Sequence, residues 1–117
     1  MSSPEQSIRD VVLPYVTGGV FFDSADIGTA PPFVVVVEIG GQTVNFLDGT
    51  SPSKRNVVFE INVFARSRLE ANTIARQVEA QMRSQLQAVV ESEVTSGYDE
   101  PTNLSGSRQQ FSAWFNT

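Results

Sequence analysis

The sequence predicts an α+β fold in which two helices pack on one face of an antiparallel sheet of about four to five strands. Within residues 57–65 every odd position is apolar, which is the period of a strand with one buried face. From residue 71 onward apolar side chains recur every three or four positions, as in an amphipathic helix. The other apolar runs are joined mostly by short turns, which favours antiparallel pairing. The expected element order is α-β-β-β-α-β.

The N-terminal third predicts a short helix and an edge strand. Ser3 can accept a hydrogen bond from the first turn of a helix, and Pro14 ends that helix because it lacks a backbone amide. A Gly-Gly pair then precedes a plausible edge strand at residues 20–22. Residues 24–32 contain glycine and a Pro-Pro pair, and are expected to form a loop.

The next apolar run, residues 33–39, carries apolar side chains on both of its faces. It is too short and too β-branched for a helix, so it predicts an inner strand. Residues 42–47 are expected to form a second strand or an irregular ribbon. Either the helices cover one face of the sheet and a neighbouring subunit covers the other, or both faces are internal. We favour the first, because two helices rarely cover both faces of a small sheet.

The strand at residues 57–65 leads directly into the second helix. Ser67 is expected to cap a helix that begins at Arg68, with the Glu70 side chain reaching back to the Ser67 amide. The predicted apolar stripe of this helix consists of Ala71, Ile74, Ala75, Val78, Met82, Leu86 and Val89.

The C-terminal part predicts a short extended piece around residues 94–95 and a final strand at residues 108–115. In that strand Phe111 falls on the side of the core together with Gln109, Ala113 and Phe115. Trp114 alternates to the other side, so it is the aromatic residue that we expect to be exposed or at an interface.

Composition excludes several classes of function for this chain, which we expect to form one domain over residues 1–117. It contains neither Cys nor His, which excludes thiolate catalysis, a Ser-His-Asp triad and metal sites built on those ligands. Its net charge is -5 and Lys54 is its only lysine, which argues against a surface that wraps a phosphate backbone. No apolar run is long enough to cross a membrane, and no leader peptide is expected at the N-terminus.

The carboxylates offer two candidate sites, and a structural role is the better interpretation of each. Glu38 and Glu60 lie on strands that could be neighbours, and glycosidases use paired carboxylates. Both alternate with buried positions, however, so we expect them to be solvated. Asp23, Asp26 and Asp48 lack the spacing of a calcium loop. We therefore expect no enzyme activity, no cofactor and no metal.

Contact with other proteins is the function that remains. Residues 40–55 place apolar side chains between polar ones, and a monomer seldom leaves such a group exposed. Residues 98–103 are expected to contribute elsewhere on the surface. The predicted interface residues are Val44, Phe46, Leu47, Lys54, Arg55, Tyr98, Asp99 and Asn103.

Several stretches of the chain resemble, in order, the small tail completion proteins of long-tailed bacteriophages and prophages, which are also described as tail terminator or tail-to-head joining proteins. The most distinctive stretch is RSRLEA, where the second helix begins. The resemblance is carried by residues 19–21 (GVF), 32–35 (PFVV), 58–65 (VFEINVFA), 66–71 (RSRLEA), 98–102 (YDEPT) and 111–114 (FSAW).

The resemblance implies a structural protein that forms a ring, expected to be a hexamer, on the head-proximal end of the tail tube. Its implied partners are further copies of itself, the tail-tube protein and the head connector protein, with DNA only passing through the lumen and no membrane. It implies a location in the virion tail, and in the bacterial host cytoplasm during assembly. The alternative is a stand-alone protein-binding adaptor or assembly chaperone that forms no ring.

Overall fold

The computed structural model describes residues 3–26, 28–41, 49 and 54–116, and it confirms the α+β class. In these residues the sheet has six strands, more than predicted, while the ribbon expected at residues 42–47 lies outside them. The elements are α1 (Pro4–Val12), the 3-10 helix η1 (Leu13–Tyr15), β1 (Val20–Phe22), β2 (Phe33–Gly40), β3 (Lys54–Ala65), α2 (Arg68–Gln85), β4 (Val89–Val90), β5 (Thr95–Asp99) and β6 (Leu104–Asn116).

The sheet is mixed rather than purely antiparallel. Its order is β1-β2-β3-β6, and β4 and β5 both pair with the far edge of β6. The long ladder of β3 and β6 runs from Lys54 opposite Asn116 to Ala65 opposite Ser105. β1 runs parallel to β2, because the connection after Phe22 carries the chain back to the starting end of the sheet before β2 begins.

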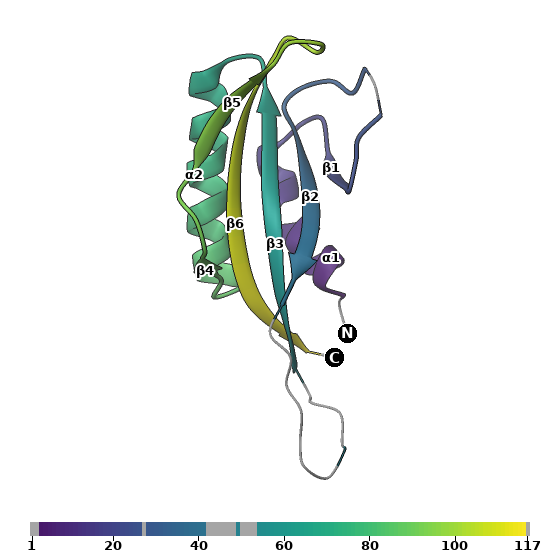
Figure 1. The fold of residues 1–117 in the computed structure, drawn as a ribbon, viewed down its shortest axis with the longest axis vertical. Coiled ribbons are helices and arrows are strands. Elements are labelled where there is room, and N and C mark those ends of the chain that lie inside the picture. Colours follow the sequence, from purple (N-terminus) through teal and green to yellow (C-terminus); the bar gives the residue numbers. More distant parts are fainter. Residues whose placement is uncertain (1–2, 27, 42–48, 50–53, 117) are drawn as a thin grey trace.

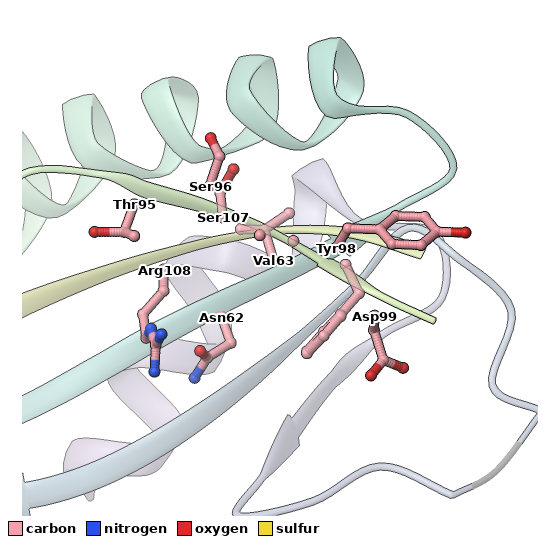
Figure 2. Close-up of a pocket in the computed structure, with 11 residues that line it drawn as sticks. Asn62, Val63, Thr95, Ser96, Tyr98, Asp99, Ser107 and Arg108 are labelled. Atoms are coloured by element: carbon pink, nitrogen blue, oxygen red, sulfur yellow. The ribbon is translucent and has the colours of Figure 1, made fainter. Parts of the chain in front are cut away.

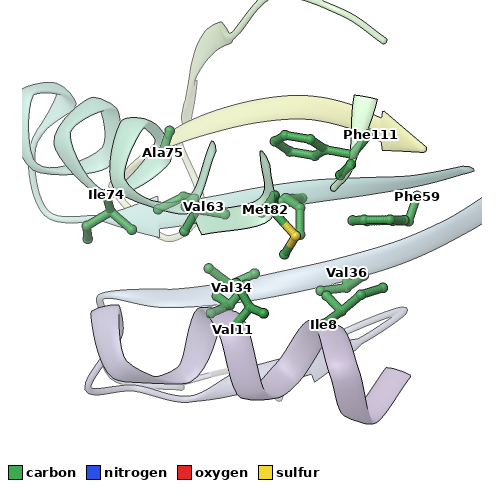
Figure 3. Packing of buried hydrophobic residues seen from close by; sticks show 14 of the residues in the cluster. Ile8, Val11, Val34, Val36, Phe59, Val63, Ile74, Ala75, Met82 and Phe111 are labelled. Atoms are coloured by element: carbon green, nitrogen blue, oxygen red, sulfur yellow. The ribbon is translucent and has the colours of Figure 1, made fainter. Parts of the chain in front are cut away.

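Both α-helices cover the same face of the sheet, as predicted. Figure 1 shows α1 behind β2 and β3, with α2 along the side of β6. Figure 3 shows side chains from both helices and from the strands meeting in one core. Within it the rings of Phe59 and Phe111 stack with centroids 5.9 Å apart. The core includes Ile8, Val11, Val34, Val36, Phe59, Val63, Ile74, Met82 and Phe111.

The cap of α2 differs from the prediction in one bond. The Ser67 hydroxyl accepts a hydrogen bond from the Glu70 amide at 3.1 Å, as expected. The Glu70 carboxylate, however, accepts from the Arg66 amide at 3.2 Å rather than from the Ser67 amide. The carboxylate therefore binds the amide that precedes the cap, and this fixes the turn between β3 and α2.

The C-terminal end of α2 was predicted too far along the chain. The helix ends at Gln85, and Gln87 adopts a left-handed backbone conformation with φ of 52°. The reversal places Val89 in β4, where it lies opposite Ser112 and is exposed. Val89 lies three residues after Leu86, so its position matches the helical spacing although it belongs to a strand.

The helix-covered face turns polar toward its β5 edge. Asn72 of α2 accepts hydrogen bonds from the hydroxyls of Ser107 at 2.6 Å and Ser96 at 3.2 Å. Gln109 of β6 is buried and donates to the Glu79 carboxylate at 2.7 Å. Hydrogen bonds therefore take over from apolar packing where α2 meets the edge of the sheet.

Candidate protein interface

The face of the sheet opposite the helices, here the open face, carries alternate residues of the same strands. Register places Phe33 opposite Phe64, Val35 opposite Asn62 and Val37 opposite Glu60 on this side. The rings of Phe33 and Phe64 stack with centroids 5.1 Å apart. In the described part of the chain no helix packs on this face, so its apolar side chains depend on one another and on the flanking loops for cover.

A hollow of about 630 Å³ lies on the open face, between the β1–β2 connection and the β5–β6 turn. Asp23, Asp26 and Asp99 are among its lining residues, and the first two are exposed. This hollow is therefore an apolar surface bordered by carboxylates. Its apolar floor includes Phe33, Val35, Val37 and Phe64.

A second hollow of about 250 Å³ continues from the first across β6 to β5. It shares Asn62, Phe64 and Asp99 with the larger one, so the two form a single trough across the strands. Figure 2 shows Ser96 and Ser107 directed toward α2, whereas Asn62, Asp99 and Arg108 lie on the side away from it. The open-face side chains that line this hollow therefore include those of Asn62, Asp99 and Arg108.

The predicted interface residues that the structure describes lie at the two ends of the β3–β6 ladder. Lys54 and Arg55 are exposed at the start of β3. Residues 98–103 lie at the opposite end, next to the start of β6. Three predicted residues, Val44, Phe46 and Leu47, lie outside the described residues.

The turn between β5 and β6 is held by its own side chains. The Tyr98 hydroxyl donates a hydrogen bond to the Asn103 side chain, and the Thr102 hydroxyl donates to the Asp99 carboxylate. Asn103 also adopts a left-handed conformation with φ of 58°. The polar groups of Tyr98 and Asn103 thus shape this turn, whereas Asp99 also lines both parts of the trough.

Sequence reasoning missed the trough, although two signals pointed to it. One is the two-sided apolar character of β2, from which we expect further cover on the open face. The other was Phe64, an aromatic residue at an even position of a strand whose odd positions are buried. A purely solvated face would not place a phenylalanine there.

The paired-carboxylate interpretation finds no support in the geometry. Glu38 lies opposite Phe59 and Glu60 lies opposite Val37 on neighbouring strands. Because side chains alternate along a strand, the two carboxylates point to opposite faces of the sheet. In the part of the chain that the structure describes, no three His, Cys, Asp or Glu side chains gather closely enough to hold a metal ion.

Comparison with known families supplies the observation that decides the assignment. The model of the family described as tail completion protein gp17 matches residues 9–116. The chain belongs to this family. The tail completion match runs from α1 to the end of β6 and so includes both faces of the sheet, which confirms the resemblance drawn from the sequence. A search of curated proteins found no match.

Membership of the tail completion family gives the chain a role in phage tail assembly. The family consists of structural phage tail proteins, which implies contact with other tail or head components and a location in the virion tail. Among the described residues, none of the helices has the length and apolar content needed to cross a membrane.

Proposed function

We propose that the protein forms a hexameric ring on the head-proximal end of the phage tail tube and joins the tail to the head connector. The observation that carries the proposal is the open face, which has an apolar trough and no helix of the described chain packed over it. Apolar faces of this kind are typical of surfaces covered by another protein. In a family of tail completion proteins, the partners with that role are neighbouring subunits and the adjoining tail and head proteins.

A ring places specific demands on its subunit. Each copy must offer two different patches, so that one meets the other on the next copy. Two candidate patches lie at opposite ends of the β3–β6 ladder, one with Lys54 and Arg55 and the other with residues 98–103. The net charge of -5 suits a lumen through which DNA passes without being retained. Assembly takes place in the host cytoplasm, and the finished ring stays in the virion.

The test uses tail tubes assembled without this protein. Adding the purified chain should produce a cap at one end of each tube in electron micrographs, and capped tails should then join filled heads. Val37→Asp introduces a charge on the open face and should abolish capping. Leu69→Asp introduces the same charge at an exposed position of α2 and should leave capping intact.

The adaptor alternative predicts a different distribution of the protein. An adaptor or assembly chaperone would bind unassembled tail subunits and would be missing from purified virions. Absence of the chain from virions, measured by mass spectrometry, together with uncapped tubes, would overturn the proposed function.

A further inference from the structure

Two glycines on the open face line the smaller half of the trough. Gly97 of β5 and Gly106 of β6 lie opposite each other, and Gly106 also lies opposite Phe64 of β3. Neither glycine has a positive φ. A Cβ at Gly97 would meet nothing within 4 Å, and one at Gly106 would come no closer than 3.5 Å to the Val63 carbonyl oxygen.

The fold therefore does not require glycine at either position. Glycine inside a strand is destabilising relative to alanine, and in strands it often marks the close approach of another backbone or ligand. The two missing side chains help to leave the smaller half of the trough open next to Phe64. This observation is independent of the apolar floor in the larger half, and it points to the same surface.

The chemistry of the trough specifies what it can bind. The larger half combines the stacked rings of Phe33 and Phe64 with the carboxylates of Asp23 and Asp26. An aromatic side chain would bury its ring on such a floor, and a neighbouring cation would face the carboxylates. The matching ligand is an aromatic residue that has a lysine or arginine beside it.

The far end of the same open face carries that combination. Trp114 of β6 is 46% exposed and lies opposite Asn56 of β3. Lys54 is exposed and lies two residues before Asn56, so it projects from the same face of the strand. One end of the open face thus presents an aromatic ring beside an ammonium group, and the other end presents an apolar hollow beside carboxylates.

We propose that the trough of one subunit receives the Trp114 and Lys54 end of the open face of a second copy. A surface group that complements a pocket elsewhere on the same molecule makes a head-to-tail contact, which closes into a ring or extends as a filament. Trp114 supplies the aromatic anchor that becomes buried in the contact. Lys54 faces Asp26 and fixes how the two subunits are aligned. This exposed ion pair adds little to the affinity. The proposal rests on the self-assembly proposed above and assigns the surfaces that carry it.

The absence of cysteine in the chain allows a direct test by cross-linking. The Asp26→Cys and Lys54→Cys variants are mixed, both free in solution and on tail tubes, and treated with a short bifunctional maleimide. A cross-linked dimer is expected from this mixture. It is not expected when Lys54→Cys is replaced by Arg76→Cys, whose side chain is exposed on α2. Adding Trp114→Ala should remove the dimer, and adding Leu69→Ala should not.

The double variant Asp26→Cys/Lys54→Cys distinguishes a head-to-tail contact from a closed pair. Cross-linked products larger than a dimer are expected. If the largest cross-linked product is a dimer, the proposal is overturned. Tubes that are capped without this cross-link would also overturn it while leaving the proposed function in place. Cross-linked multimers of a protein that caps no tubes would support the contact and count against the proposed function.

Discussion

The two faces of the sheet use the same strands for different purposes. Phe59 and Phe64 lie five residues apart on β3 and point to opposite faces. Phe59 is fully buried beneath the helices, whereas Phe64 is half-buried and lines the trough. Strand alternation therefore assigns one half of the side chains to the stability of the fold and offers the other half to a neighbour. Mutations on the two faces should separate loss of stability from loss of assembly.

The largest difference is expected between Phe59→Ala and Phe64→Ala. Phe59→Ala should lower the free energy of unfolding by about 3–5 kcal/mol, because it removes a buried ring and leaves a cavity against Phe111. Phe64→Ala should lower the free energy of unfolding clearly less, because the Phe64 ring is half-exposed. Among the described residues, Phe33 is the one aromatic residue that it stacks on. Urea unfolding followed by fluorescence measures both. Equal losses would show that the open face is part of the folding core.

A mutation at the polar edge of the covered face should destabilise the protein less than Phe59→Ala. Asn72→Ala removes the acceptor for Ser107, whose hydroxyl is buried, so we expect a loss of about 1–3 kcal/mol. Adding Ser107→Ala should recover part of that loss, because the unpaired hydroxyl is then gone. A double-mutant cycle from denaturant unfolding tests this coupling. Fully additive losses would mean that the two side chains do not act together.

The cap of α2 tests how firmly the helix is held over the core. Ser67→Ala should destabilise the protein by about 1 kcal/mol, because the Glu70 amide loses its hydrogen-bond acceptor. Ser67→Asp keeps an acceptor at the helix N-terminus and serves as the matched control. Thermal unfolding monitored by circular dichroism compares the two variants. If both variants unfold at a lower temperature than the original protein, Ser67 has a role other than capping the helix.

The smallest effect on stability is expected at Gly97. Gly97→Ala should leave the free energy of unfolding unchanged or raise it by at most about 1 kcal/mol, since the added Cβ meets nothing and strands disfavour glycine. Gly18→Ala is the contrasting variant, because its Cβ would fall 1.9 Å from the Ala30 carbonyl oxygen. Chemical denaturation measures both. Marked destabilisation by Gly97→Ala would remove the argument that this glycine serves an approaching chain.

Periodicity predicted the elements that bury apolar side chains and failed where hydrogen bonds determine the structure. It identified both α-helices and the buried face of β3, because each presents a regular apolar pattern. It did not predict residues 104–107 as strand or β5 in full, since Leu-Ser-Gly-Ser and Thr-Ser-Gly-Tyr-Asp carry no apolar alternation. Those segments pair through their backbones and the Asn72 hydrogen bonds.

The interface was harder to predict than the fold, for a physical reason. The sequence predicts interface residues such as Lys54 and Asp99 from two segments, residues 40–55 and 98–103, but a docking surface depends on which residues the sheet brings together. Phe33 and Phe64 are 31 positions apart in the numbering and become neighbours only through the β2–β3 register. Gly97 helps to leave the trough open because it has no side chain, and the pattern of apolar residues in the sequence cannot predict this.

The attachment of β5 has a consequence for local motion. None of its five residues is buried, and it is held by the β6 backbone, by the Ser96–Asn72 hydrogen bond and by the hydrogen bonds of Tyr98 and Asp99 in the β5–β6 turn. Such a segment can open without exposing the core beneath α2. The amide hydrogens of β5 should therefore exchange with solvent well before those of β3. Each opening would briefly leave a bare β6 edge beside Gly106, at the border of the trough.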